Sequence, residues 1–122
     1  MAKILVVDDE EMIRKILVRV LMKAGYEVIQ ASGGAEAIEV LKSGVHLDMM
    51  VTDMKMPTVT GIDVLKAKKD LNDLTPVIIL TGVLNEQQDY TELNRLGLGA
   101  QDILYKPIDL LLFLDAVKNK LV

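Results

Sequence analysis

Five short apolar runs, each followed by a segment with helical periodicity, constrain the fold of this chain more than any other feature. The runs are the length of buried strands and are rich in β-branched residues, as is typical of strands covered on both faces. They lie at residues 3–7, 27–31, 49–51, 76–80 and 102–105. The helical segments lie at residues 11–24, 32–43, 61–71, 85–96 and 109–121. Because parallel strands need crossover connections, this alternation predicts an α/β fold with a doubly wound, five-stranded parallel sheet.

Hydrophobic spacing and capping preferences also predict details within the helices. Ser32 is a suitable N-cap for the second helix, because its hydroxyl can accept a hydrogen bond from a free backbone amide. Lys68 falls on the outer face of the helix at 61–71, whereas the polar helix at 85–96 has only Tyr90, Leu93 and Leu96 to hold it against the sheet.

Length and composition set limits on the class of protein. A chain of 122 residues is enough for one core, so residues 1–122 are expected to form a single domain. No run approaches the roughly 18 apolar residues of a membrane span, and the N-terminus leads directly into a strand pattern. There is no cysteine for a disulfide or a zinc site. We therefore expect a cytoplasmic protein without membrane contact. The net charge of −4 and the scattered basic residues predict no direct nucleic-acid binding.

Polar side chains that can bind ligands or take part in catalysis follow four of the five predicted strands. They are Asp8, Asp9, Asp53, Thr81 and Lys106. In a parallel sheet the carboxyl ends of the strands share one edge, and the crevice beyond that edge is where ligands bind. The sequence therefore predicts that these five residues form one site, although each acid taken alone could be a turn residue that satisfies nearby amides.

The predicted cluster has the composition of a phosphoryl site. Three carboxylates at about 5 Å and an effective dielectric constant of about 20 repel one another by roughly 3 kcal/mol per pair, so they favour a bound cation. Oxygen ligands without His or Cys select Mg²⁺ or Mn²⁺. The ammonium of Lys106 and the hydroxyl of Thr81 could bind phosphoryl oxygens while one carboxylate attacks phosphorus. The alternative is that Lys106 only bridges the acids and stabilises the fold.

The ordered set of motifs resembles the receiver domain of two-component response regulators over essentially the whole chain. The matching segments are Val6-Val7-Asp8-Asp9-Glu10, Asp53-x-x-Met56-Pro57 followed by Gly61, Thr81-Gly82, and Lys106-Pro107. The resemblance implies a (βα)5 flavodoxin-like fold with strand order 2-1-3-4-5. It also implies a phosphorylation-dependent signalling switch rather than an ordinary enzyme. Such a switch catalyses only its own phosphorylation and dephosphorylation.

Roles for individual residues follow from the same resemblance. Asp53 would be the phosphoacceptor, and Asp9 would bind Mg²⁺ directly with Asp8 assisting through water. The backbone carbonyl of Lys55 would be a further ligand. Thr81 and Lys106 would contact the phosphoryl group, with a cis peptide bond between Lys106 and Pro107.

The implied partners are a sensor histidine kinase or phosphotransfer protein as the donor, and a downstream effector or a second copy of the chain as the receiver of the signal. The output face would be formed by the helix at 85–96, the strand at 102–105 and the helix at 109–121. In the last helix Leu110 belongs to the predicted buried stripe. Leu111 and Leu112 fall off that stripe, so we expect them to face solvent or to widen an apolar docking surface.

The chain departs from the family pattern at the predicted switch. Ile103 stands three residues before Lys106, where the family usually carries Tyr or Phe. Tyr105 is expected to point to the other side of the strand, so it would be a poor substitute. The aromatic part of the switch should therefore be lost while the chemistry survives. Lys55 and Val83 occupy loop positions that could tune the access of water to an acyl phosphate.

Two other classes of protein share some of these features. A phosphatase of the haloacid-dehalogenase type also uses an aspartyl phosphate, but it needs an Asp-x-Asp pair after the first strand, whereas this chain has adjacent Asp8 and Asp9. A receiver-like interaction module that never turns over phosphate is disfavoured because the acceptor and metal residues are all present.

Overall fold

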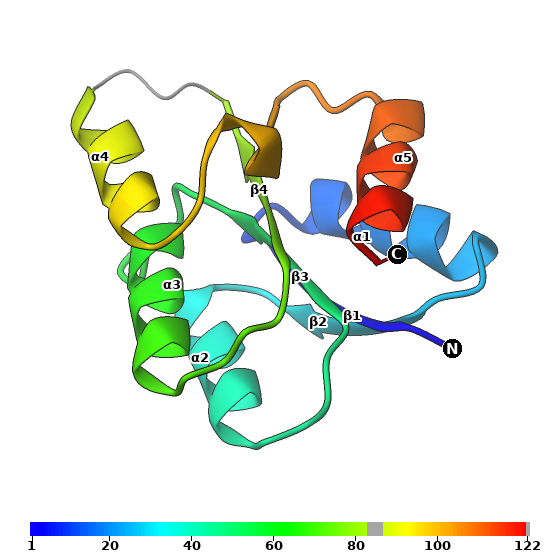
Figure 1. Cartoon of the computed structure of the whole chain (residues 1–122). Coiled ribbons are helices and arrows are strands. Elements are labelled where there is room, and N and C mark those ends of the chain that lie inside the picture. Colours follow the sequence, from blue (N-terminus) through cyan, green and yellow to red (C-terminus); the bar gives the residue numbers. More distant parts are fainter. Residues whose placement is uncertain (83–86, 122) are drawn as a thin grey trace.

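The computed structural model describes residues 1–82 and 87–121 and contains a five-stranded parallel sheet flanked by helices on both faces (Figure 1). The strands are β1 (Lys3–Val7), β2 (Glu27–Ala31), β3 (Met49–Asp53), β4 (Val77–Thr81) and β5 (Ile103–Tyr105). The helices are α1 (Glu11–Lys23), α2 (Gly34–Lys42), α3 (Gly61–Asp70), α4 (Gln87–Arg95), the short 3-10 helix η1 (Ala100–Asp102) and α5 (Leu110–Leu121). The strand order β2-β1-β3-β4-β5 confirms the predicted doubly wound fold.

The central strands are buried on both faces, which explains why their sequences are continuous apolar runs. Alternate residues of each strand enter two separate cores. One core lies between the sheet and helices α2, α3 and α4, and includes Met50, Ile79 and Leu93. The other lies beneath α1 and α5, and Phe113 is its largest fully buried side chain. Figure 1 shows the same division, with α1 and α5 on one side of the sheet.

The start of α2 differs from the prediction that Ser32 is its N-cap. The N-cap is Gly33, and the Ser32 hydroxyl instead donates a hydrogen bond of 3.1 Å to the Glu36 carboxylate. The helix begins at Gly34, where a Cβ atom would lie 2.4 Å from the carbonyl oxygen of Val59. Close approach to the loop after β3 therefore decides where this helix begins.

Lys68 was predicted to face outward, and that prediction is wrong. Lys68 is only 8% exposed, and its ammonium donates a 2.8 Å hydrogen bond to the backbone carbonyl oxygen of Asp73. The Asp73 carboxylate lies 3.6 Å from the same ammonium. The segment after α3 folds back over the lysine. Burial lowers the pKa of Lys68, and the neighbouring Asp73 offsets part of that shift.

Of the three residues predicted to hold α4 against the sheet, Leu93 is buried and Leu96 packs against the same core, as predicted, whereas the Tyr90 side chain is exposed and contributes through its hydroxyl. The Tyr90 hydroxyl lies 2.6 Å from the hydroxyl of Tyr105 on β5. Ile103, two residues earlier in β5, packs into the core that contains Leu93. Tyr105 and Ile103 thus lie on the same, α4-facing side of the strand, as residues two apart must. The prediction that Tyr105 points to the other side was therefore wrong.

The start of the last helix confirms one prediction and corrects another. Leu111 and Leu112 are 76% and 59% exposed, as expected for residues off the buried stripe. Leu110 is also exposed, because it is the first residue of α5 and the buried contacts of the helix begin at Phe113. The Asp109 carboxylate accepts hydrogen bonds from the backbone amides of Leu111 and Leu112 and so caps the helix.

Asp102 was predicted to begin the fifth strand, but it ends the 3-10 helix η1 instead. Its buried carboxylate accepts a 2.9 Å hydrogen bond from the backbone amide of Gly99 and is paired with Lys120. These contacts turn the chain sharply just before β5. Strand pairing therefore starts one residue later, at Ile103.

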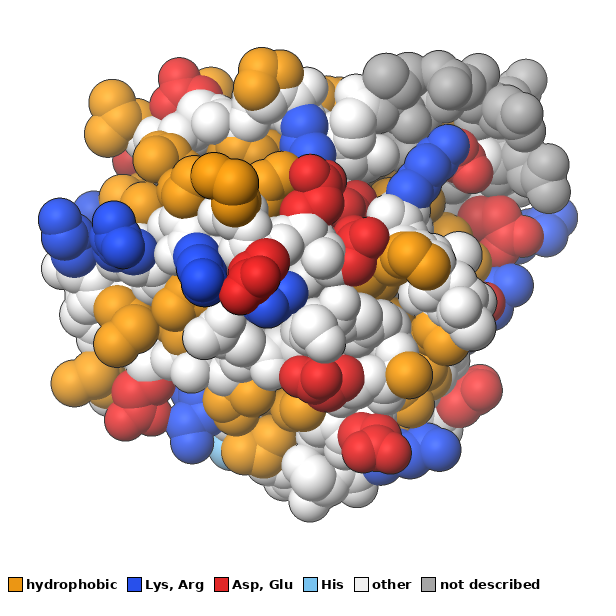
Figure 2. All heavy atoms as spheres, turned by 180° about the vertical axis from the view of Figure 1, so that it is seen from behind, with side chains coloured by type: hydrophobic (Ala, Val, Ile, Leu, Met, Phe, Trp, Pro, Cys, Tyr) orange, Lys and Arg blue, Asp and Glu red, His pale blue; other side chains and the backbone are white. Residues whose placement is uncertain are grey.

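On the face shown in Figure 2, hydrophobic and charged side chains are mixed, and Lys and Arg are dispersed among Asp and Glu. Within residues 1–82 and 87–121, no helix is both long enough and apolar enough to cross a membrane.

Candidate functional site

The candidate site lies beyond the carboxyl ends of the central strands. Asp8 directly follows β1, Asp53 is the last residue of β3, and Lys106 directly follows β5. The register pairs Asp53 with Leu80 of β4, which places Thr81 one residue further along the same edge. Parallel pairing thus collects side chains that are far apart in the sequence.

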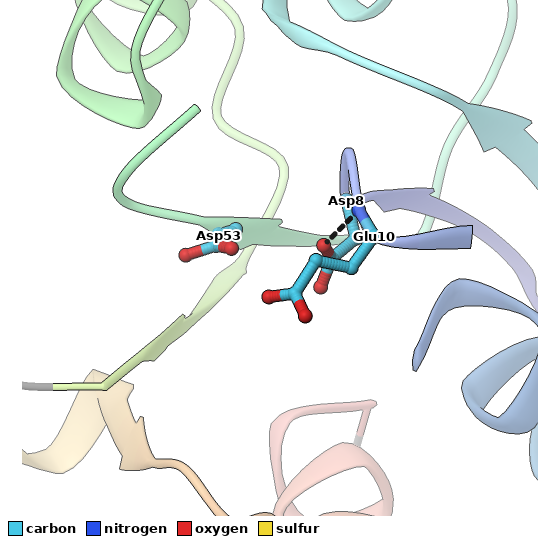
Figure 3. A group of neighbouring side chains, drawn as sticks. All are labelled: Asp8, Glu10 and Asp53. Atoms are coloured by element: carbon cyan, nitrogen blue, oxygen red, sulfur yellow. Dashed lines mark hydrogen bonds between the residues drawn. The ribbon is translucent and has the colours of Figure 1, made fainter. Parts of the chain in front are cut away.

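Three carboxylates meet at this edge, and one of them was not predicted. Oxygen atoms of Asp8, Glu10 and Asp53 all lie within 4.8 Å of one another (Figure 3). Asp9 is exposed and does not belong to this group among the described residues. The chain bends at Asp9 after β1 ends, and the Glu10 amide donates a hydrogen bond to Asp8 Oδ1, so this turn brings residue 10 back beside residue 8. The expected trio was Asp8, Asp9 and Asp53, and in the structure Glu10 takes the place of Asp9 in this group.

Lys106 lies among the three carboxylates. Its Nζ atom is 2.9 Å from Asp53 Oδ2, 3.1 Å from Glu10 Oε1 and 3.6 Å from Asp8 Oδ2. Burial by itself would lower the pKa of the ammonium, but the hydrogen bonds to the Asp53 and Glu10 carboxylates outweigh that effect and raise it. Lys106 is therefore a permanent positive charge at the centre of the site.

Asp8 is completely buried, and its environment is unfavourable for a negative charge. Its Oδ1 atom accepts a 2.9 Å hydrogen bond from the Glu10 amide, and Arg14 donates to its backbone carbonyl. Burial is the main cause that raises the pKa of this carboxyl, and the hydrogen bond from Glu10 and the charge of Lys106 counteract it.

Two buried oxygen atoms at this edge have no hydrogen-bond partner within the described part of the chain. They are Asp8 Oδ2 and the hydroxyl Oγ1 of Thr81. Buried polar atoms are normally satisfied, so these two indicate a missing ligand. A cation would satisfy the first, and an anionic oxygen would accept a hydrogen bond from the second. The residues present therefore fit a divalent metal ion together with a phosphoryl group.

The first prediction concerns Asp8→Asn in metal-free protein. The variant should be more stable than the wild type by about 1 kcal/mol at neutral pH, because it removes a buried charge placed for a ligand. Since the folded state raises the pKa of Asp8, the folded protein holds that proton more tightly than the unfolded chain does. The stability due to Asp8 therefore falls as pH rises above the ordinary pKa of 3.8. Urea unfolding over a pH series would measure this.

The advantage of the Asp8→Asn variant should shrink as the pH falls below 3.8, where the wild-type carboxyl is protonated as well. A constant difference between variant and wild type at every pH would contradict this electrostatic explanation.

The loop after β3 holds the Asp53 carboxylate in place. The backbone amide of Lys55 donates a 3.2 Å hydrogen bond to Asp53 Oδ1, and the Gly61 amide donates to the Met54 carbonyl at 2.9 Å. A Cβ atom on Gly61 would lie 2.3 Å from the carbonyl oxygen of Asp53. Thr60 and Asp63 form a reciprocal capping box that fixes the start of α3 at this point. Gly61 thus allows α3 to begin against the backbone of the acceptor residue.

The second prediction is that Gly61→Ala destabilises the protein by about 2 kcal/mol, because the new methyl group would meet main-chain atoms that have no room to move. Thermal or urea unfolding would measure the loss. Gly44→Ala is unsuitable as a control, since Gly44 has a positive φ of 78°. Gly82→Ala is the matched control: no atom of the described residues lies within 4 Å of its Cβ position, so its effect should be smaller.

The outcomes for the predicted site residues are therefore mixed. Asp8, Asp53 and Lys106 come together, and the peptide bond between Lys106 and Pro107 is cis, as predicted. Direct metal binding by Asp9 and by the Lys55 carbonyl stays a prediction, and Val83 lies outside the described residues. Sequence reasoning assigned no role to Glu10, although its position two residues after Asp8 is a signal that could have found it.

Comparisons with known proteins agree with this geometry. The family model described as the response regulator receiver domain matches residues 4–118. The chain is 38% identical over 121 residues to the sporulation initiation phosphotransferase F of Bacillus subtilis, covering 98% of this chain and 93% of that protein. It is 37% identical over 115 residues to the response regulator RR06 of Streptococcus pneumoniae, covering 94% of this chain but 51% of the relative. The chain therefore spans about half the length of that relative.

A solved structure of the chemotaxis protein CheY4 of Vibrio cholerae superposes with a TM-score of 0.85 at 30% sequence identity, covering 98% of each chain. The likeness thus extends over nearly all of the fold and includes every strand that carries a site residue.

Proposed function

This chain belongs to the response regulator receiver family, and on that premise we propose that it acts as a phosphoacceptor switch in which Asp53 receives a phosphoryl group. Receiver domains are signalling switches of two-component systems rather than ordinary enzymes. The observation that carries the proposal is the 2.9 Å contact between Asp53 Oδ2 and Lys106 Nζ, beside two buried oxygens, Asp8 Oδ2 and Thr81 Oγ1, that have no hydrogen-bond partner among the described residues.

The proposed reaction transfers a phosphoryl group from a phosphohistidine on a sensor kinase or phosphotransfer protein. A carboxylate oxygen of Asp53 attacks phosphorus, an O–P bond forms, and the P–N bond to the donor breaks. The electron pair stays on the imidazole nitrogen, which gains its proton from water. Hydrolysis of the acyl phosphate ends the cycle: water attacks phosphorus, the O–P bond to Asp53 breaks, and inorganic phosphate leaves while the Asp53 carboxylate is restored.

Asp8 and Asp53 would hold a Mg²⁺ ion, with Mn²⁺ as an alternative, and Asp9 and the Lys55 carbonyl are the further ligands that we propose. When bound, the metal supplies positive charge that offsets the charge of the phosphoryl oxygens.

The remaining side chains have separate roles in this proposal. Lys106 neutralises a phosphoryl oxygen through its ammonium, and Thr81 donates its free hydroxyl to another. The loop from Lys55 to Gly61 keeps the Asp53 carboxylate oriented toward the incoming donor. This pocket would be complete only when the phosphoryl group is present, because the Thr81 hydroxyl has no other hydrogen-bond partner within residues 1–82 and 87–121.

The output would be read on the face made by α4, β5 and α5, by an effector or a second copy of the chain. This face carries the exposed Leu111 and Leu112 and the hydroxyl pair of Tyr90 and Tyr105. With Ile103 at the usual aromatic position, we propose that the tyrosine pair is one contact between α4 and β5 that a change at Thr81 would alter. Whether the chain works alone or within a longer regulator, we propose the same receiver chemistry for residues 1–122.

The phosphatase alternative is less well supported, because the second acid after β1 is Glu10 rather than the aspartate of an Asp-x-Asp pair, and because the receiver-domain model matches residues 4–118. A module without phosphoryl turnover is disfavoured by the buried Thr81 hydroxyl, which has no hydrogen-bond partner in the described part of the chain.

The proposal is tested by incubating the protein with acetyl phosphate and Mg²⁺ and measuring its intact mass. We expect a gain of one phosphoryl group, reduced to background by a chelator. Reduction of the acyl phosphate with borohydride should then label the peptide that contains Asp53. Absence of the mass gain, or a label confined to another peptide, would reject the proposed function.

A further inference from the structure

We propose that Glu10 is a displaceable counter-ion of Lys106 that restrains the arrival of a phosphoryl group at Asp53. This inference rests on the proposed function and adds a regulating residue to that site. It starts from a carboxylate that has no assigned role but lies within the acidic group.

Glu10 is placed to compete for Lys106. Its Oε1 atom lies 3.1 Å from the ammonium, nearly as close as the 2.9 Å contact from Asp53. Figure 3 shows its side chain reaching from the start of α1 into the space that Asp8 and Asp53 also face. One ammonium therefore serves two carboxylates, and an incoming phosphoryl oxygen would be a third acceptor for the same donor.

Glu10 differs from the other two acids in how easily it can leave. Its side chain is 57% exposed, whereas those of Asp8 and Asp53 are almost completely buried. It is the N-cap residue of α1, but its side chain makes no capping hydrogen bond to the helix. Rotation into solvent therefore breaks the ion pair with Lys106 and leaves the fold intact.

The charge of Glu10 acts in opposite directions on ligands of opposite sign. A carboxylate within 4.8 Å of the Asp53 and Asp8 oxygens attracts a divalent cation and repels the oxygens of a phosphoryl group. The buried Thr81 hydroxyl, which has no hydrogen-bond partner within residues 1–82 and 87–121, indicates independently that a ligand belongs at this edge. Removing this one charge should thus weaken cation binding and strengthen anion binding at the same site.

The experiment compares Glu10→Gln with the wild type by isothermal titration calorimetry. Titration with Mn²⁺ alone should give a dissociation constant about five-fold higher for the variant, because a unit charge at about 5 Å in partly aqueous surroundings has roughly that effect. Titration with beryllofluoride at saturating Mg²⁺ should give a dissociation constant about five-fold lower, because Lys106 is released from its competitor. A damaged fold would weaken both ligands, so the opposite signs separate the two explanations.

Glu11→Gln is the matched control. It removes the same charge from the next residue, whose carboxylate pairs with Lys15 at 3.2 Å instead of facing the site. Both dissociation constants should stay within about two-fold of the wild type, since this charge is exposed and screened. Glu10→Ala should reproduce the opposite changes of Glu10→Gln and so exclude an effect of the new amide.

Equal or weaker beryllofluoride binding by Glu10→Gln and Glu10→Ala, or equal changes in Glu11→Gln, would overturn the role of Glu10. Failure of the proposed function looks different: the wild type itself would not bind beryllofluoride with Mg²⁺, or Asp53→Asn would bind it as well as the wild type.

Discussion

Replacing Asp53 with Asn is expected to lower the rate of phosphoryl uptake from acetyl phosphate by more than about 100-fold, because an amide oxygen lacks the charge and the nucleophilicity of a carboxylate. Asp53 is the only acid of the group that stands at the end of the central strand β3, with its orientation fixed by the Lys55 amide. The rate is measured from intact masses over time at fixed Mg²⁺ concentration.

The fold of the Asp53→Asn variant should be preserved. Lys106 keeps Asp8 and Glu10 as partners, and the repulsion between the Asp8 and Asp53 carboxylates is removed. Its free energy of unfolding should therefore stay within about 1 kcal/mol of the wild type. Phosphoryl uptake at the wild-type rate in this variant would show that Asp53 is not the acceptor.

Replacing Lys106 with Met should lower the free energy of unfolding by about 3 kcal/mol in metal-free protein. The change removes the positive charge shared by three carboxylates, two of them buried, and breaking a buried ion pair from one side leaves an uncompensated charge. Because Mg²⁺ binds the folded state, added Mg²⁺ should recover most of this loss and should stabilise the variant more than the wild type. Urea unfolding with and without Mg²⁺ measures both effects.

Lys15→Met is the control for Lys106→Met. Lys15 forms an exposed pair with Glu11 on α1, so its loss should cost no more than about 0.5 kcal/mol and should not respond to Mg²⁺. A small loss in Lys106→Met, without rescue by Mg²⁺, would mean that the lysine does not serve as the counter-ion of the acid group.

The same variant decides between the two interpretations of Lys106 that the sequence left open. If the lysine only bridges the acids, then Mg²⁺ should restore the phosphoryl uptake of Lys106→Met together with its stability. If it also contacts the phosphoryl group, uptake should stay low after stability has been restored.

Much of this architecture was predictable because it follows from residue patterns within short stretches of the sequence. The apolar run at Met49–Val51 predicts a strand buried on both faces, and the polar residue after each run marks the carboxyl end. Once the strands are parallel, Asp8, Asp53 and Lys106 must meet at one edge, whatever their distance in the sequence. The same logic placed Leu111 and Leu112 on the surface, because a helix has one buried stripe.

The sequence by itself therefore determined the alternation of strands and helices, the edge that carries the site and the chemistry of its acids and lysine. The tertiary structure decided where long or flexible side chains reach, and these contacts have no periodicity. It brought Glu10 into the acid group in place of Asp9, buried Lys68 beneath the segment that follows α3, and joined Tyr90 to Tyr105 across two elements. The physical reason is that backbone periodicity sets the direction of a side chain, whereas its partner depends on the distance to residues brought near by packing.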